Sequence, residues 1–473
     1  MFKKYRVIHF VGIGGIGMSG IAELLHNLGY KVTGSDLRIS ETTARLKKSG
    51  IKVYIGHSAE NIDDAHVLVI SSAVPGNNPE VIEAIKRSIP VIPRAEMLAE
   101  LARLKYGILV AGAHGKTTTT SLVSAILAHS GLDPTVIIGG RLKATGSNSR
   151  LGEGEFLVAE ADESDGSFLK LSPTIAVVTN IDREHMDFFK TIESLKEAFL
   201  YFINKVPFYG TSIVCIENEH LRSLVPFIKR RCITYGFSND AELRAENIRK
   251  GFMSVIFDVV YKDKKIKDFY VPLAGTHNVL NSLAAISVAL VLNSDVSVIK
   301  DALREFSGIQ RRAEFKGEAG GIRIYDDYGH HPAEIKATLR AAKESLLYSM
   351  QSKENVGRET GRLFVLFQPH RYTRTEDLLD DFATSFKDAD SLSVLDIYPA
   401  GERPLEGVNS AILVERIKKE GHNRVIYVKD REEAIKNIIS SVKAGDIFLT
   451  LGAGDVWKAG EEIIGRLTGK SNE

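Results

Sequence analysis

Short apolar runs alternate with helical patterns along most of the chain. In the first hundred residues, RVIHFVG at 6–12 and HVLVISSAVP at 66–75 have the continuous apolar character of buried strands. MSGIAELLHNLG at 18–29 and NPEVIEAIKRS at 78–88 have apolar positions at helical spacing. Repeated strand–helix–strand units are typical of a parallel sheet covered by helices. The pattern therefore predicts an α/β fold.

The same pattern restarts twice. A strand, a glycine loop and a helix follow one another in LARLKYGILVAGAHGKTT at 101–118, and a new series begins at EFKGEAGGIRIYDDYGHHP, 314–332. The last region has further apolar runs at 362–369, 391–399 and 446–454. We therefore expect three tandem α/β domains: a Rossmann-like domain at 1–104, a central P-loop domain with a mostly parallel sheet at 105–314, and a Rossmann-like domain at 315–473.

Composition excludes several classes of protein. The chain has 473 residues, 44% of them hydrophobic and 26% charged, and a net charge of +1. This balance gives no electrostatic reason to expect a nucleic-acid or anionic-membrane partner. Two cysteines do not form a disulfide framework. No signal-peptide pattern and no apolar run of about 18 residues is present, so we expect a soluble, cytoplasmic protein. The sequence carries no signal for its oligomeric state.

The first glycine-rich loop, VGIGGIGMSG at 11–20, follows a predicted strand and precedes a helix. Gly12, Gly14 and Gly17 match G-x-G-x-x-G, and Asp36 closes the second strand 24 residues after Gly12. Small residues let the backbone approach a pyrophosphate, which the helix N-terminus then attracts. On these residues alone the ligand could be NAD or another dinucleotide-like diphosphate, and a structural turn stays open as well.

The second loop, AGAHGKTTTTS at 111–121, is a shortened P-loop. A standard P-loop would place its first glycine at position 110, where this chain has Val110; the preceding glycine is Gly112. In the remaining Gly115-Lys116-Thr117, the lysine can neutralise phosphate oxygens and the threonine can hold Mg²⁺. Two phosphate loops in one chain predict two different phosphorylated ligands.

Acidic residues follow two of the central strands. Glu160 lies among apolar residues within FLVAEADESD, where an acid without a role carries a burial cost, so it is the favoured metal ligand. Further polar residues lie in the loops that follow these two strands. For the carboxylates among them a solvated charge is the default interpretation, and His185 could be a metal ligand or a surface residue. The residues are Asp162, Glu163, Asp165, Asn180, Asp182, Glu184, His185 and Asp187.

Two polar clusters follow strands of the last domain, where α/β sheets bind ligands. Arginines three residues apart can present paired guanidinium groups to a carboxylate or phosphate, although simple helix-cap residues are an alternative. The clusters comprise Asp326, Asp327, Tyr328, His330 and His331, and then His370, Arg371, Tyr372 and Arg374.

Taken together, these segments resemble the Mur ligase family of peptidoglycan synthesis. The resemblance runs in order from residue 7 to 457, and Ala113 departs from it, because the family usually has threonine there. The segments are VGIGGIGMSG, GAHGKTTTT, VAEADESD, TNIDREHMDFF, GTHNVLNSLAAI, GIQRRAE, DDYGHHPAE, QPHRYTRT and LGAGD.

The resemblance implies that the first loop holds the diphosphate of UDP-N-acetylmuramate and the second holds ATP. We therefore expect an ATP-dependent ligase that joins L-alanine to the sugar carboxylate through an acyl phosphate, with Mg²⁺ as cofactor, in the synthesis of the cell wall that supports cell shape and division. A sister ligase that adds an L-alanyl-γ-D-glutamyl-diaminopimelate tripeptide is the main alternative. An NAD-dependent dehydrogenase leaves the second loop without a role, and a non-catalytic nucleotide-binding module leaves the polar clusters unexplained.

Site residues are implied by the same resemblance. For ATP they are Gly112, Ala113, His114, Gly115, Lys116, Thr117, Thr118, His277, Asn278, Asn281 and Arg312. For the UDP-sugar they are Gly12, Gly14, Gly15, Gly17, Asp36, Ser71 and Arg94. For the amino acid they are Tyr328, His330, His370, Arg371 and Arg374. The expected metal ligands are Thr117, Glu160 and His185, and the expected catalytic residues are Lys116, Glu160, His185 and His330 as the base. Carbamylation of Lys190 or Lys196, which some sister ligases use, stays open.

Overall fold

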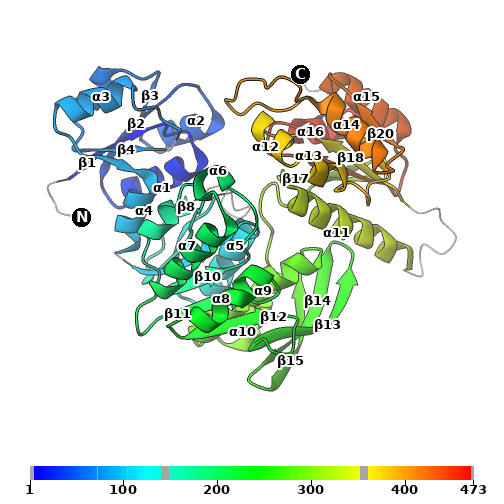
Figure 1. The fold of residues 1–473 in the computed structure, drawn as a ribbon, viewed down its shortest axis with the longest axis horizontal. Helices are drawn as coiled ribbons and strands as arrows, with labels where there is room; N and C mark the ends of the chain where they lie inside the picture. Colours follow the sequence, from blue (N-terminus) through cyan, green and yellow to red (C-terminus); the bar gives the residue numbers. More distant parts are fainter. Residues whose placement is uncertain (1–4, 72, 104, 140–148, 352–360, 470–473) are drawn as a thin grey trace. The chain divides into compact units, whose positions relative to one another are not determined.

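The computed structural model of the chain describes residues 5–71, 73–103, 105–139, 149–351 and 361–469 (Figure 1). The described strands form three sheets, which contain five, ten and six strands in chain order. Helices follow most of the parallel strands, so the predicted α/β class is confirmed. No helix among the described residues is long and apolar enough to cross a membrane.

The first sheet is entirely parallel, with the strand order β3-β2-β1-β4-β5. The order reverses between β1 and β4, and ligands of such sheets bind beyond the carboxyl ends of the strands at this point. The first glycine loop begins there, directly after β1. The elements are β1 (Val7–Val11), α1 (Ile16–Asn27), β2 (Lys31–Asp36), α2 (Glu41–Lys48), β3 (Lys52–Ile55), η1 (Ala59–Ile62), β4 (Val67–Ile70), α3 (Pro79–Lys86), β5 (Val91–Pro93) and α4 (Arg94–Ala102).

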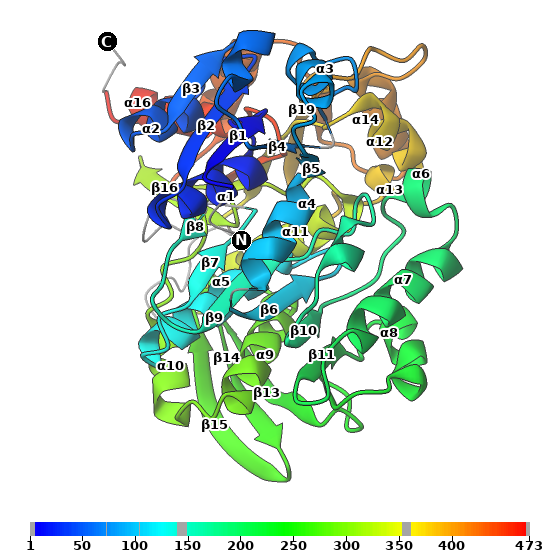
Figure 2. The same ribbon diagram turned by 90° about the vertical axis from the view of Figure 1, so that its left-hand side faces the viewer.

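The second sheet has the order β15-β14-β13-β12-β11-β10-β6-β9-β7-β8. Its central strand β6 (Tyr106–Ala111) pairs in parallel with both β9 (Phe156–Glu160) and β10 (Ile175–Val178), as Figure 2 shows. The loop after β6 is therefore flanked by the carboxyl ends of two neighbouring strands. The other strands are β7 (Thr135–Ile137), β8 (Ser149–Arg150), β11 (Thr211–Cys215), β12 (Cys232–Gly236), β13 (Leu243–Gly251), β14 (Ser254–Tyr261) and β15 (Lys264–Val271).

The helices of this region connect the parallel strands. Most of α5 is buried, whereas α7 buries one face, on which Leu195, Phe199 and Phe202 recur at helical spacing. The helices are α5 (Lys116–His129), η2 (Ser167–Lys170), α6 (Met186–Phe189), α7 (Ile192–Asn204), α8 (Glu219–Leu224), η3 (Val225–Phe227), α9 (Thr276–Val291) and α10 (Val296–Arg304).

The third sheet has the order β16-β17-β21-β18-β19-β20, and only the β16–β17 pair is antiparallel. Apolar cores cover both faces. One contains Ile335, Phe382 and Leu413, and the other contains Ile435 and Ile463. The elements are β16 (Glu314–Ala319), β17 (Ile322–Asp327), α11 (Pro332–Gln351), β18 (Leu363–Phe367), α12 (Tyr372–Asp377), α13 (Leu379–Ala383), β19 (Ser391–Val394), α14 (Ser410–Lys419), β20 (Val425–Tyr427), α15 (Arg431–Ser441), β21 (Ile447–Leu451) and α16 (Trp457–Leu467).

The chain divides into two compact units. The first comprises residues 1–246, 258–269 and 280–307, and the second comprises 247–257, 270–279 and 308–473. The first sheet and strands β6 to β12 of the second thus belong to one unit, and the third sheet belongs to the other. The three sheets agree with the expected three-domain architecture, while the boundaries at 104 and 314 stay predictions.

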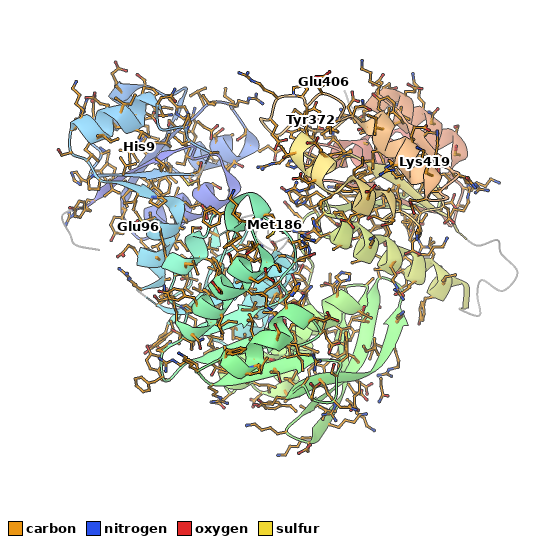
Figure 3. All side chains as sticks on the ribbon, viewed as in Figure 1. His9, Glu96, Met186, Tyr372, Glu406 and Lys419 are labelled. Atoms are coloured by element: carbon orange, nitrogen blue, oxygen red, sulfur yellow. The ribbon has the colours of Figure 1, made fainter. Side chains whose placement is uncertain are left out.

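A buried polar cluster holds helix α3 against the first sheet. The Glu80 side chain is fully buried at the start of α3, and its carboxylate accepts hydrogen bonds from Ser35 Oγ at 2.5 Å and Asn61 Nδ2 at 2.6 Å. His9, which Figure 3 labels, lies in the middle of β1. Its Nε2 is 3.6 Å from the same carboxylate. Burial alone would raise the pKa of Glu80. These three partners outweigh that effect and hold its pKa below the ordinary value.

Replacing this carboxylate should destabilise the first domain in a pH-dependent way. Because the folded-state pKa is lowered, the charged group stabilises the fold above the unfolded pKa, and this contribution is lost as pH falls through the folded pKa. Glu80→Gln should therefore cost about 1–3 kcal/mol at pH 7, measured by urea unfolding, and the difference from wild type should shrink below pH 4. Glu83→Gln on the same helix is the control, with a smaller effect. An equal loss at both pH values would contradict the electrostatic explanation.

Candidate active site

The loop between β6 and α5 requires glycine at two positions. Gly112 and Gly115 have φ values of 132° and 82°, a region that favours glycine. A Cβ atom on Gly112 would lie 2.2 Å from Thr179 Oγ1, and one on Gly115 would lie 2.5 Å from Asn281 Oδ1. Asn180 fixes the loop from β10, because its Oδ1 accepts the N–H of residue 114 at 2.8 Å. The backbone is therefore held in a tight turn that opens helix α5.

Lys116 is anchored at the start of α5 by a buried carboxylate. Its Nζ donates to the two carboxylate oxygens of Glu163 at 2.8 and 2.9 Å and to the carbonyl of Gly112 at 2.6 Å. Glu163 is only 2% exposed. Burial by itself would lower the pKa of Lys116, but the negative charges of Glu163, Asp162 and Glu184 raise it above its ordinary value. The default interpretation of Glu163 as a solvated loop charge is thus wrong, because it is the counterion of this lysine.

Three side chains beside Lys116 form a candidate cation site. Glu163, Glu184 and His185 each offer a ligand atom, and these atoms lie within 4.8 Å of one another. His185 adopts a left-handed conformation, with φ of 58°, directly before α6. Carboxylate oxygens are the ligands that Mg²⁺ prefers, and an imidazole nitrogen can complete such a set. The residues present therefore fit a divalent cation.

The expected metal ligands are only partly brought together. Among the expected acidic and histidine ligands, His185 belongs to this group and Glu160 does not, and the metal-binding role of Thr117 stays a prediction. Thr117 is buried in the first turn of α5, and Glu160 ends β9, where its Oε1 accepts the N–H of Gly139 at 2.6 Å. The sequence analysis named Glu163 and Glu184 but treated both as solvated loop charges by default, so it did not favour them as metal ligands.

The expected adenine-side residues fall in helix α9. Asn281 is buried, and its Oδ1 accepts a hydrogen bond from Thr119 of α5 at 3.2 Å, so it lies beside the second glycine loop. His277 and Asn278 lie one turn earlier, where Asn278 Nδ2 donates to the carbonyl of Ala274 at 2.7 Å. Burial, and then the positive charge of Arg312, lowers the pKa of His277 to about 4.

The residues around the first glycine loop are gathered as expected. Gly14 N donates to Asp36 Oδ2 at 2.9 Å, and a Cβ on Gly14 would lie 2.8 Å from the same oxygen. A Cβ on Gly12 would lie 3.6 Å from Ser71 Oγ, and one on Gly17 would lie 2.4 Å from Arg94 Nη1. Gly15 is the N-cap of α1. Residues at the ends of β2, β4 and β5 thus surround the start of helix α1.

Aromatic rings at the ends of β17 and β18 form a cluster in the last domain. The His330 ring centroid lies 5.4 Å from that of Tyr328 and 5.9 Å from that of His370, and His370 stacks on Tyr398 at 5.5 Å. Arg374 Nη1 donates to the His370 carbonyl at 3.2 Å. Burial, more than any neighbouring charge, lowers the pKa of His330 to about 3 and that of His370 to about 4. Both imidazoles are therefore neutral at pH 7.

Two expected arginines lie at the edges of this cluster. Arg371 is exposed, and its N–H donates to the carbonyl of Tyr398 at 2.9 Å. Arg312 pairs with Glu334 at 3.4 Å and lies over the Tyr328 ring, with its guanidinium carbon 5.5 Å from the centroid. The structure thus groups Tyr328, His330, His370 and Arg374 more closely than it groups Arg371 with them.

Arg311 was not predicted from the sequence, yet it connects three of the motifs. Its guanidinium donates to Asp326 Oδ2 at 2.9 Å and to the carbonyls of Gly452 and Gly454. The backbone N–H of Tyr328 donates to the backbone carbonyl of Arg311 at 2.7 Å. The signal available in the sequence was that Arg311 directly precedes Arg312, which was expected to bind ATP. Tyr398 was also missed, although it follows a buried strand of the same sheet.

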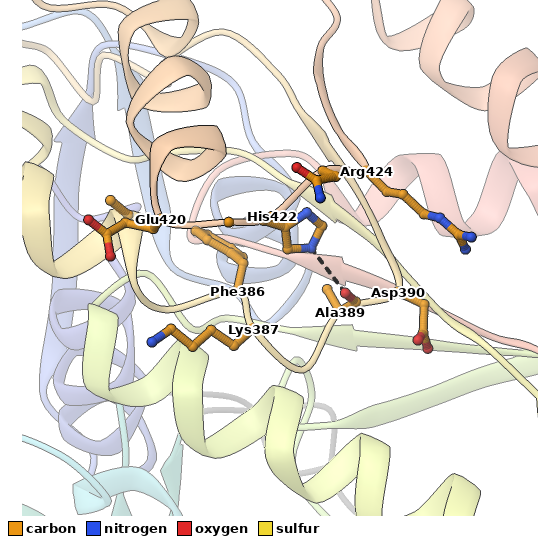
Figure 4. A pocket seen from close by; sticks show the side chains of 10 residues that line it. Phe386, Lys387, Ala389, Asp390, Glu420, His422 and Arg424 are labelled. Carbon is orange, nitrogen blue, oxygen red and sulfur yellow. Dashed lines mark hydrogen bonds between the residues drawn. The ribbon is translucent and has the colours of Figure 1, made fainter.

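One cavity of the last domain lies apart from all these residues. Its volume is about 340 Å³, and its lining includes Phe386, His422 and Arg424 (Figure 4). His422 Nε2 pairs with the carbonyl of Ala389 at 3.0 Å. None of the expected site residues lines this cavity, so it is not part of the candidate active site.

Family models match the chain in three consecutive segments. The Mur ligase family catalytic domain matches residues 7–106, the Mur ligase middle domain matches 110–289, and the Mur ligase glutamate ligase domain matches 311–454. The three matched segments follow the three sheets in order.

Full-length relatives and solved structures agree with these matches. The chain is 55% identical over 467 residues to UDP-N-acetylmuramate–L-alanine ligase of Geotalea daltonii and 53% identical over 468 residues to that of Geobacter sulfurreducens, with 99% of each chain covered. It resembles the crystal structure of UDP-N-acetylmuramate-alanine ligase from Thermotoga maritima, with a TM-score of 0.82, 29% identity and coverage of 98% and 99%. A murein peptide ligase from Psychrobacter arcticus has a TM-score of 0.68 and 25% identity, with coverage of 99% and 100%. The chain belongs to the Mur ligase family.

Proposed function

We propose that the chain is an ATP-dependent ligase that joins L-alanine to the carboxylate of UDP-N-acetylmuramate in peptidoglycan precursor synthesis. The observation that carries this proposal is the presence of two different glycine loops, each directly before a helix, in one compact unit. Only the second loop has a lysine at the helix start. Identity above 50% to alanine-adding ligases over almost the whole chain supports the choice of substrates.

The first loop is the proposed UDP-sugar site. The N-terminus of α1 offers N–H groups and a positive dipole to the diphosphate, and Gly12, Gly14, Gly15 and Gly17 leave room for it. Arg94 contributes a positive charge at the first turn of α1. Asp36 and Ser71 border the same loop, where they can accept or donate hydrogen bonds to the sugar nucleotide.

The second loop is the proposed ATP site. The backbone N–H groups of residues 112–118 surround the phosphates, and Asn281 of the same compact unit binds the remainder of the nucleotide. His277, Asn278 and Arg312 remain ATP ligands expected from the family resemblance alone. The Lys116 ammonium, now held by Glu163, exchanges this carboxylate for phosphate oxygens. Thr117, Glu160 and His185, together with Glu163 and Glu184 beside His185, would hold Mg²⁺. A bound Mg²⁺ offsets the negative charge on the transferred phosphoryl group.

The reaction has two steps because a free carboxylate is a poor electrophile. An oxygen of the sugar carboxylate attacks the γ-phosphorus of ATP, ADP leaves, and an acyl phosphate forms. The amine of L-alanine then attacks the acyl carbon, and inorganic phosphate leaves with the oxygen that carried it. Lys116 stabilises the charge that develops in the first step, and both substrates must be held in line for transfer.

The aromatic cluster of the last domain is the proposed alanine site. Arg374 binds the carboxylate of the amino acid, with Arg371 beside it at the start of α12. Tyr328 and His370 form the walls. His330 was expected as the base, but burial lowers the pKa of its imidazole to about 3, which makes it a weak acceptor for the proton of the incoming ammonium, so its proposed role is to line the amino-acid site. ATP and a nucleotide sugar are cytoplasmic metabolites, so we place the reaction in the cytoplasm.

A substrate panel tests the proposed function. ADP release should require both UDP-N-acetylmuramate and an amino acid, and L-alanine should be used best. Glycine and L-serine should react more slowly, since one methyl group is worth only about 1–3 kcal/mol of discrimination. Faster turnover with L-alanyl-γ-D-glutamyl-diaminopimelate would make the chain a tripeptide ligase. Tight NAD binding that is abolished by Gly14→Val would contradict the ligase assignment altogether.

Lys116→Ala should abolish phosphoryl transfer without affecting the first loop. Removing a charge that stabilises the transition state should lower the rate of ADP formation about 10²–10³-fold or more, while calorimetry should show unchanged binding of UDP-N-acetylmuramate. Glu160→Ala should have a similar effect on the rate. The matched control is Lys170→Ala, because Lys170 is an exposed lysine that pairs with Glu96. This variant should retain its activity. Normal ADP formation by the Lys116 variant would rule out the second loop as the ATP site.

A further inference from the structure

Adjacent carboxylates after β9 contact basic residues of the two proposed nucleotide sites. Glu163 binds Lys116 at the second loop, whereas Asp162 Oδ2 lies 3.2 Å from Arg94 Nη2. Arg94 is the first residue of α4, which follows β5 of the first sheet. Helix α4 lies beside α1 in the two views of the fold (Figures 1 and 2). A single loop of the ATP-binding domain therefore reaches both proposed nucleotide sites.

The Arg94 guanidinium is pressed against the first turn of α1. A Cβ atom on Gly17 would lie 2.4 Å from Arg94 Nη1 and 3.3 Å from its guanidinium carbon. A side chain at that position would displace the guanidinium. The guanidinium thus lies beside the helix N-terminus that forms the proposed diphosphate site.

An arginine side chain is flexible, so it stays at this position only if another group holds it. Asp162 is that group. Its Oδ2 contacts Arg94 Nη2, and its Oδ1 accepts the N–H of Ser164 at 3.1 Å. The carboxylate is therefore fixed by its own loop.

We propose that Asp162 is a positioning residue for the UDP-sugar site: it holds the Arg94 guanidinium over the first turn of α1, ready for the diphosphate. The ATP-binding domain thereby completes the binding site of the first domain. This inference rests on the proposed function, because it assigns the first loop to a diphosphate ligand.

The sign of the effect separates positioning from simple electrostatics. Asp162 is negative, so its removal would strengthen binding of an anionic diphosphate if it acted through its charge alone. If it acts by holding Arg94, its removal must weaken binding. Asp165 provides a matched comparison, because it is an exposed aspartate on the same loop whose Oδ1 accepts only a local N–H, that of Ser167, at 3.0 Å.

Calorimetric titration of the full-length chain with UDP-N-acetylmuramate tests the proposal. Asp162→Asn should raise the dissociation constant about tenfold, as expected for loss of a charged hydrogen bond, while ATP affinity stays within about twofold. Asp165→Asn should bind as the wild type does, and Asp162→Glu should recover part of the affinity. Arg94→Ala should weaken binding, and the Arg94→Ala/Asp162→Asn double variant should bind no more weakly than Arg94→Ala alone.

Other results would overturn the proposal. Unchanged or tighter binding by Asp162→Asn would show that the aspartate does not position Arg94. Additive losses in the double variant would show that the two residues act independently. A wild-type chain that binds ATP but not UDP-N-acetylmuramate would instead contradict the proposed function, so the two failures are distinguishable.

Discussion

An ammonium group that is largely shielded from water needs a neutralising partner, and the pairing of Lys116 with Glu163 meets this requirement. Leaving such a charge without a partner in the interior is strongly unfavourable. The pair fixes the first residue of α5, the glycine turn before it and the loop after β9 relative to one another. Glu163 occupies the side of Lys116 where phosphate oxygens are proposed to bind. The carboxylate of Glu163 thus keeps this anion-binding position formed when no phosphate is bound.

The loop after β9 also explains why two nucleotide sites can serve one reaction. The proposed reaction needs a carboxylate from the first ligand close to the γ-phosphate of the second, since phosphoryl transfer depends on alignment. Asp162 and Glu163 connect the same loop to Arg94 and Lys116, one in each of the first two domains. The four residues lie in one compact unit, so this connection is part of its packing.

The sequence was sufficient for the elements and for the residues that backbone geometry demands. Continuous apolar runs identified β1, β6, β9 and β18, and glycines before helices identified both loops. The direction of the side chains was not available from the pattern. Glu160 stays the predicted metal ligand, whereas the buried partner of Lys116, which the sequence did not identify, is Glu163, three residues on. A linear pattern does not determine which carboxylate in EADESD turns inward, because this depends on Lys116, 47 residues earlier in the chain.

Long-range contacts account for the other omissions. Arg311 is held by carbonyls more than 140 residues away, and Tyr398 meets His370 only because β18 and β19 are neighbours. The low pKa values of His330 and His370 likewise arise from burial, which the sequence does not display. Family resemblance supplied the roles of these regions, whereas their contacts required the fold.

The central claim is that the two loops bring a carboxylate and a γ-phosphate together to form an acyl phosphate. Its most direct test follows ¹⁸O from the labelled carboxylate of UDP-N-acetylmuramate during turnover with ATP and L-alanine. The account predicts that one labelled oxygen appears in each inorganic phosphate and the other stays in the new amide, with ADP as the nucleotide product. Unlabelled phosphate, or AMP and pyrophosphate as products, would contradict it.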